Sequence, residues 1–172
     1  MRHWPRMRRL WPLLFAGLAL SCSTTAGFKP VTSQDSDVPC PGGSLIWNLE
    51  INDQRAQRLE SERLSGLLRD SLSHSFPGCQ WASPSRRDAP TIAIEIHRFA
   101  ADFDGAIFDA AAEWTVSARD ASGRTLMEFQ ADARVSRPNY RGSNNEKEAL
   151  RAAFEEAVNR TLAGLRTVSG GR

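Results

Sequence analysis

The cysteines carry the clearest chemistry in this 172-residue chain, and Cys22 is the first of three. It directly follows an apolar run over residues 10–21 that ends in small residues, and four arginines precede that run: Arg2, Arg6, Arg8 and Arg9. This order of basic, apolar and small residues is typical of a secretory signal. We therefore interpret residues 1–21 as a signal peptide and Cys22 as a lipobox cysteine, diacylated on sulfur and first in the mature chain. An ordinary cleaved signal is the alternative, and a transmembrane anchor is less favoured because about 20 apolar residues are needed to span a bilayer.

The two remaining cysteines, Cys40 and Cys79, form an even pair in an exported chain. A disulfide between them is the default expectation in an oxidising compartment. Cys40 precedes a predicted strand over residues 44–51, and Cys79 follows a predicted helix that Asp53 begins and Pro77 ends. At about 3.3 Å per strand residue and 1.5 Å per helix residue, both elements span roughly 30 Å. If they run antiparallel, the two ends that carry the cysteines meet.

Other reactive side chains lack the partners that catalysis or metal binding requires. The two histidines of the mature chain, His74 and His97, have no second His or Cys at ligand spacing, so we interpret both as surface residues. Three acids near one predicted hairpin lack the spacing of a calcium loop and indicate a solvated turn: Asp102, Asp104 and Asp109. The sequence has no nucleophile elbow, zinc-protease motif or phosphate-binding loop. We therefore expect no enzymatic activity, no metal and no cofactor.

Charge and length bound the remaining possibilities. Residues 1–21 hold four arginines and no acid, so their removal changes the formal net charge from +2 to −2. The basic character belongs to the discarded segment, which excludes nucleic acid as a partner. The 151 residues left when 21 of the 172 are removed are the usual size of one domain.

Apolar residues at two predicted loops indicate an interface with a partner protein. Ile107 and Phe108 fall at the tip of a predicted hairpin over residues 106–108, where a polar tip is usual. Tyr140, the only tyrosine, lies in a predicted loop over residues 136–145. Exposed aromatic residues on loops are typical of contact surfaces, so we expect envelope proteins to bind here. The alternative is that these side chains fold back on the domain.

Hydrophobic periodicity predicts the elements that hold these residues. Alternation predicts strands over residues 44–51, 91–99, 112–119 and 126–135, with a short edge strand over 80–82. Apolar stripes at helical spacing predict helices over residues 53–76 and from Asn144 or Asn145 to Leu165. The alternative to a core position for the tryptophans is to stack on a sugar or line a lipid groove. Trp47 and Trp114 fall on inward strand positions and are expected in the core, whereas Trp81 is left open between these alternatives.

Two apolar helix stripes require one sheet face to cover. We therefore expect an α+β fold, a two-layer sandwich of a mainly antiparallel sheet with two helices on one face. The composition predicts a mobile, lipidated tether over residues 22–43, a single domain over 44–166 and a flexible tail over 167–172.

The segment from Pro90 to Leu165 resembles the ABC-type transport auxiliary lipoproteins. The likeness lies in the isoleucine-rich strand, the Asp-Gly hairpin, the stretch AAAEWTVSARDASGRTL and the final helix ALRAAFEEAVNRTLAGL. These proteins are similar in plan to the outer-membrane lipoproteins of lipopolysaccharide assembly. The resemblance implies a noncatalytic part of an envelope machine that moves lipid or another hydrophobic compound.

The expected location follows from Cys22 and from its neighbour. Ser23 after the lipidated cysteine favours sorting to the outer membrane, so we expect a lipid anchor on its periplasmic face. The expected partners are the membrane, through that anchor, and envelope proteins. A structural lipoprotein or one of outer-membrane assembly is the alternative function, and a small periplasmic hydrolase is a third.

Overall fold

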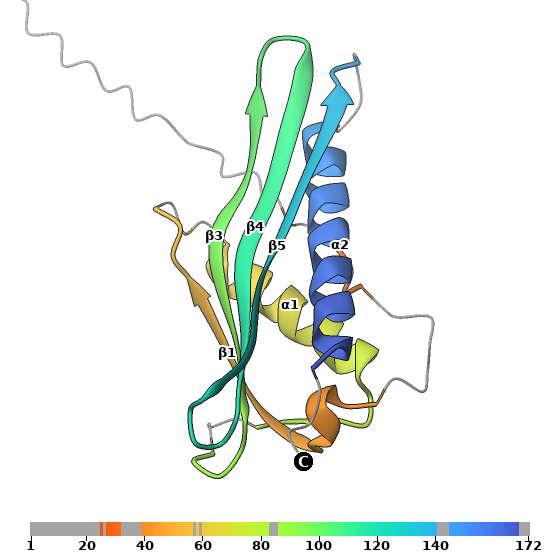
Figure 1. Ribbon diagram of the computed structural model, residues 1–172. Coiled ribbons are helices and arrows are strands. Elements are labelled where there is room, and N and C mark those ends of the chain that lie inside the picture. The colour runs from red at the N-terminus through yellow and green to blue at the C-terminus, as the bar shows by residue number, and fades with distance from the viewer. Residues whose placement is uncertain are drawn as a thin grey trace, which may run out of the picture.

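Five strands form one sheet in the order β2-β1-β3-β4-β5, and two helices cover it (Figure 1). The computed structural model describes residues 25, 27–31, 39–56, 58, 60–82, 86–140 and 145–168. In chain order the elements are the 3₁₀ turn η1 (Pro41–Gly43), β1 (Ile46–Asp53), α1 (Ser61–Ser75), β2 (Gln80–Ala82), β3 (Thr91–Phe103), β4 (Ile107–Arg119), β5 (Thr125–Pro138) and α2 (Asn145–Arg166). β1 pairs in parallel with β2 and β3, whereas β3, β4 and β5 form a long antiparallel meander. The mostly antiparallel sheet and its two helices confirm the predicted α+β class.

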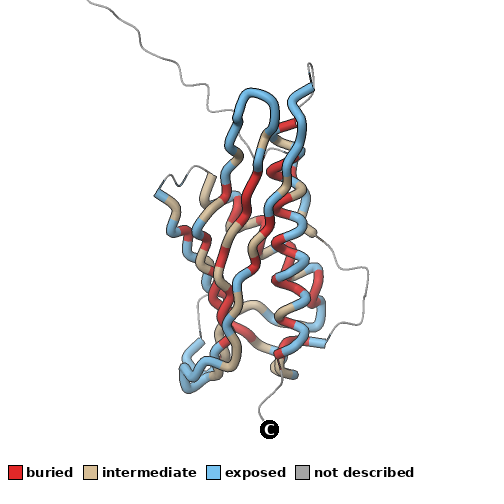
Figure 2. The backbone as a smooth tube through the Cα atoms, turned by 45° about the horizontal axis from the view of Figure 1, so that its top comes forward, coloured by how far each residue is buried: buried red, intermediate tan, exposed pale blue. Residues whose placement is uncertain are grey.

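The core lies between the sheet and the helices, where buried residues line the inner face of the strands (Figure 2). Trp47 and Trp114 are fully buried there, as their strand positions predicted. Trp114 Nε1 donates to Thr161 Oγ1 at 2.8 Å, and Trp47 Nε1 donates to the carbonyl of Pro41 at 3.1 Å. Trp81 is half-buried. Both buried indole N–H groups therefore have hydrogen-bond acceptors, which offsets the cost of their desolvation.

α2 packs closely on β5 because Gly164 carries no side chain. A Cβ atom at this position would lie 2.3 Å from Phe129 Cζ. The Phe129 ring therefore rests where a helix side chain would otherwise stand. Arg160, one turn earlier in α2, donates to the carbonyl of Asp132 in β5.

α1 begins at Ser61, later than the predicted start at Asp53. Asp53 is the last residue of β1 and pairs with Ile96 of β3. Its buried carboxylate forms a 2.6 Å ion pair with Arg55. Glu60, just before the helix, has a φ of 57°, the only positive value among the described non-glycine residues. The ion pair of Asp53 and the left-handed conformation of Glu60 are both incompatible with a helix that starts at Asp53, so α1 begins only at Ser61.

Part of the expected tether packs on the domain. Phe28 is buried, and its ring centroid lies 6.3 Å from that of Phe99 and 6.2 Å from that of Phe154. Thr25 is also buried, and its backbone N and Oγ1 donate to Glu60 Oε2 at 2.8 and 2.7 Å. The composition predicted a mobile segment here. Instead, the long-range contacts of Thr25 and Phe28 hold this stretch on the domain, although it has no hydrophobic periodicity.

Other boundaries also differ from the predicted ones. β3 continues to Phe103 and β4 starts at Ile107, so the hairpin is longer than expected. β5 continues to Pro138, into the predicted loop. Val168 is buried in the predicted tail, where its carbonyl accepts a 3.1 Å hydrogen bond from Gly42 N. Within the described part of the chain, neither helix has the length and apolar character needed to cross a membrane.

Candidate functional site

The β3–β4 hairpin extends beyond the first turn of α2 and ends in a short turn over residues 104–106 (Figure 1). Asp104 forms this turn: its Oδ1 accepts hydrogen bonds from the backbone N–H groups of Ala106 at 2.9 Å and Ile107 at 2.8 Å. These bonds hold the pKa of the Asp104 carboxyl below its usual value. Gly105 has a φ of 98°, which other residues rarely adopt. The turn thus lies two residues earlier than the predicted tip at residues 106–108, and Ile107 and Phe108 belong to β4.

Aromatic side chains cluster where the hairpin leaves the helices. Phe103 and Phe108 are paired across the two strands, and their rings stack with centroids 4.6 Å apart. Two residues earlier on the same face, Ala101 pairs with Ala110 at the edge of the core. The apolar inner face of the sheet therefore continues past the cover of α2. We call Phe103, Ile107 and Phe108 the hairpin tip.

The hairpin tip is partly open to solvent. Phe103 is 50% exposed and Ile107 is 37% exposed, whereas Phe108 is half-buried under the Phe103 ring. The predicted residue Phe108 therefore stacks with Phe103, which the sequence analysis did not single out, whereas Ile107 lies on the other face of β4. The alternation of Phe103 with Phe99 along β3 is the signal that would have identified it.

Tyr140 lies beside the hairpin tip. The preceding residue, Asn139, donates from its backbone N to the carbonyl of Ala106 in the hairpin turn at 2.7 Å. Tyr140 is 69% exposed, so three of the four aromatic or large apolar residues at this end present at least a third of their surface to solvent. The predicted partner-binding residues thus share one end of the molecule.

Acidic residues lie on the face of the sheet opposite Phe103 and Phe108, which is also the face of Ile107. Asp102 and Asp109 face each other across β3 and β4. Asp102 forms an ion pair with Arg98, and Asp109 accepts a hydrogen bond from Ser136 Oγ. Neighbouring like charges destabilise a strand pair, and these two partners offset that effect.

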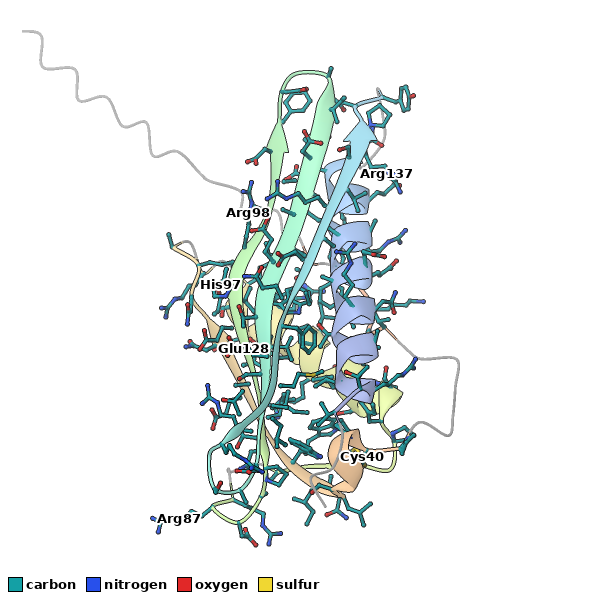
Figure 3. All side chains as sticks on the ribbon, in the orientation of Figure 1. Cys40, Arg87, His97, Arg98, Glu128 and Arg137 are labelled. Carbon is teal, nitrogen blue, oxygen red and sulfur yellow. A yellow bond between two sulfur atoms is a disulfide. The ribbon has the colours of Figure 1, made fainter. Side chains whose placement is uncertain are left out.

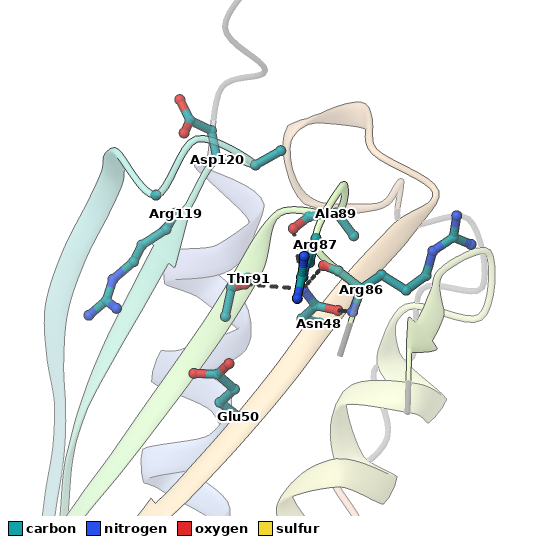
Figure 4. A pocket seen from close by; sticks show the side chains of 10 residues that line it. Asn48, Glu50, Arg86, Arg87, Ala89, Thr91, Arg119 and Asp120 are labelled. Atoms are coloured by element: carbon teal, nitrogen blue, oxygen red, sulfur yellow. Dashed lines mark hydrogen bonds between the residues drawn. The ribbon is translucent and has the colours of Figure 1, made fainter. Parts of the chain in front are cut away.

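The far end of the sheet contains a pocket of about 310 Å³ (Figure 4). Its polar groups mainly hold the chain together. Asn48 Nδ2 donates to the carbonyls of Arg86 at 2.7 Å and Ala89 at 3.2 Å, and Arg86 N donates back to Asn48 Oδ1 at 2.7 Å. Arg86 also pairs with Asp88, and Asp120 pairs with Arg124. The bonds of Asn48 therefore hold the surface loop over residues 86–89 against β1.

The other residues that the sequence singled out lie apart from the hairpin tip. Cys40 and Cys79 form a disulfide with a Cα–Cα distance of 5.5 Å, at the opposite end of the domain from Arg137 (Figure 3). His74 contacts its own helix through the Asp70 carbonyl, and His97 contacts Thr115 Oγ1 at 2.9 Å. The described residues contain no group of three or more His, Cys, Asp or Glu placed to hold a metal ion. Cys22 lies outside the described residues.

Comparisons with known proteins give structural neighbours. No family model and no curated protein sequence matches the chain. A candidate lipoprotein from Caulobacter crescentus shares 18% identity and a TM-score of 0.47, over 71% of this chain and 92% of that one. A candidate neuraminyllactose-binding hemagglutinin homologue from Helicobacter pylori shares 10% identity and a TM-score of 0.48, over 76% and 90% of the two chains. The rare lipoprotein B from Shewanella oneidensis shares 12% identity and a TM-score of 0.44, over 67% and 91%.

Proposed function

We propose that this chain is a noncatalytic lipoprotein, anchored through Cys22 to the periplasmic face of the outer membrane. In this proposal it is an auxiliary subunit of an envelope ABC-type system that transports lipid or another hydrophobic compound. It binds a protein of that system through the hairpin tip and Tyr140. The observation that carries the binding role is the stacked pair of Phe103 and Phe108 at the end of the hairpin, where Phe103 is half exposed.

The physical argument rests on what a binding subunit requires. Binding energy at protein interfaces is concentrated in a few aromatic or arginine side chains that become buried in the complex. β5 pairs with β4 as far as Ile107, so three hydrogen-bonded strands hold these side chains in place before binding and little conformational entropy is lost. By contrast, Asn48 in the pocket at the far end of the sheet bonds to the loop that lines this pocket.

Acylation of Cys22 tests the anchor. The wild-type N-terminal peptide should carry acyl chains by mass spectrometry and the protein should fractionate with outer membranes. Cys22→Ala should abolish the acyl mass and release the protein to the soluble periplasm. A wild-type peptide without acyl mass would contradict the anchor.

Photo-crosslinking tests the docking surface. A photoreactive residue at position 108 or 140 should capture a permease or a substrate-binding component of one transport system. Tyr140→Ala should weaken that association by about 1–2 kcal/mol, the usual effect at a hot spot. Leu45 provides the matched control because it is 67% exposed but lies in the chain just before β1, away from the hairpin. If Leu45→Ala weakens capture as much as Tyr140→Ala does, the docking surface is not at the hairpin.

A further inference from the structure

The chain just after Cys22 is fixed to the domain at three points. Thr25 bonds Glu60, Phe28 packs between two aromatic rings of the core, and Val31 N donates to Ser71 Oγ at 2.9 Å. Glu60, which accepts both bonds from Thr25, is the residue in the left-handed conformation. Backbone strain of this kind persists only where surrounding contacts outweigh it. We call residues 25 and 27–31 the N-terminal brace.

The sequence places Cys22 close to the start of the N-terminal brace. Cys22 precedes Thr25 by three residues, and three extended residues span at most about 10 Å. A lipid anchor on Cys22 therefore holds the Thr25 region of the domain close to the bilayer surface. A mobile tether over residues 22–43 would impose no such limit.

The N-terminal brace packs against Phe99, at the base of the hairpin. Phe28 N donates to the Thr25 carbonyl, so Thr25 lies within one turn of Phe28, whose ring rests on Phe99. From Phe99, β3 runs four residues further to Phe103, a distance of about 13 Å along the strand. The distance of about 13 Å from Phe99 to Phe103 is comparable to the greatest distance of about 10 Å that three residues can span between Cys22 and Thr25.

We infer that the hairpin end is the membrane-proximal end, and that the hairpin tip binds an integral protein of the membrane that holds the anchor. This rests on the lipid attachment proposed above. Residues 99–110 contain three acids and no base, and Asp104, at the turn, accepts hydrogen bonds from the backbone N–H groups of Ala106 and Ile107. Arg98 pairs with Asp102, and Arg137 lies opposite Phe108 on β5. Because an ionised carboxylate is costly in hydrocarbon, the hairpin cannot bury its aromatic pair in lipid without that cost. An apolar protein surface with basic residues at its rim fits both the rings and the acids.

Orientation is measurable without the partner. The full acylated chain is placed in vesicles of phosphatidylethanolamine and phosphatidylglycerol that carry a headgroup quencher. A fluorescent amino acid replaces either Ala106 in the hairpin turn or Ser122 in the β4–β5 turn, both exposed. Position 106 should be quenched several-fold more than position 122. Equal or reversed quenching overturns the inference even if Cys22 is acylated.

A lengthened anchor gives the control for orientation. An insertion of about 20 Gly and Ser residues between positions 24 and 25 adds a flexible span of about 25 Å. It should remove most of the difference in quenching between positions 106 and 122. An unchanged difference would mean that the short connection to Thr25 does not set the orientation.

The nature of the partner is tested in intact envelopes. A photoreactive residue at Phe108 should form adducts with an integral membrane protein, at a peptide that contains basic residues, whereas the same residue at Ser122 should not. Adducts with phospholipid, or with soluble periplasmic proteins alone, overturn the inference. An absence of acyl mass at Cys22 would instead contradict the proposed lipid anchor, on which this inference rests.

Discussion

The buried ion pair between Asp53 and Arg55 at the end of β1 should make the free energy of unfolding decrease at acidic pH. Asp53→Asn should remove this contribution to the pH dependence. Burial raises the pKa of Asp53, but hydrogen bonds from Arg55 and Ser61 outweigh it and lower the pKa from 3.8 to about 2. The side chains of Asp53 and Arg55 are only 4% and 9% exposed, so little solvent screening weakens the pair. Arg55 Nη1 also donates to the Phe99 carbonyl at 3.4 Å, which links the pair to the base of the hairpin.

The direction of the pH effect follows from the two pKa values. The unfolded carboxyl takes up its proton first, so the stabilisation is complete above about pH 5 and is lost as the pH falls towards 2. A difference of almost two pKa units corresponds to about 2 kcal/mol. Asp53→Asn should cost about 3 kcal/mol at neutral pH, because it removes the carboxylate of a buried ion pair.

Urea denaturation of both proteins between pH 7 and the acid limit of folding measures this effect. The gap in unfolding free energy between wild type and Asp53→Asn should narrow by about 2 kcal/mol as the Asp53 carboxylate becomes protonated. Glu155→Gln serves as control, since Glu155 forms an exposed pair with Arg151 and should change stability by less than about 1 kcal/mol. A gap that stays constant over the acid range would refute the depressed pKa of Asp53.

Three further predictions follow from the core and the disulfide. Thr161→Val removes the acceptor of the buried Trp114 N–H and should lower stability by about 1–3 kcal/mol in urea titrations; no change would mean that another acceptor replaces it. Gly164→Ala places a Cβ against the Phe129 ring and should lower stability by about 1–3 kcal/mol, measured as a decrease in Tm; an unchanged Tm would show that the ring moves freely. Thiol titration of unfolded, unreduced protein acylated at Cys22 should find no free cysteine, and two reactive thiols would contradict the disulfide.

The sequence predicts the elements whose periodicity reflects burial. Alternation along β1 and β3 and the apolar stripe of α2 each correspond to residues that pack into the core. The start of α1 was wrong for a physical reason: Ala56 fits the helical spacing but is exposed, and periodicity cannot show that Asp53 pairs with Arg55 or that Glu60 is left-handed. Tertiary contacts override local preference at this junction.

The contacts of Phe28 could not be found from local sequence. A single phenylalanine in a stretch rich in Ser, Thr and Pro has no periodic partner, and its burial depends on rings that lie far away in the chain, Phe99 and Phe154. The hairpin tip was partly predictable because Ile107 and Phe108 interrupt a polar turn. Phe103 was missed because its position depends on how far β3 extends beyond the core.

The disulfide also protects one edge of the sheet from aggregation. β2 is only three residues long, and it covers the outer edge of β1. Cys79 directly precedes it, and Gln80 N donates to the Leu45 carbonyl at 2.7 Å, so the covalent bond fastens this short edge strand in place. Without the bond, β2 would separate readily and expose the backbone of β1, an edge on which other chains can add strands and aggregate. Production in a reducing cytoplasm should therefore yield aggregates, while oxidative export of the same chain should yield monodisperse protein.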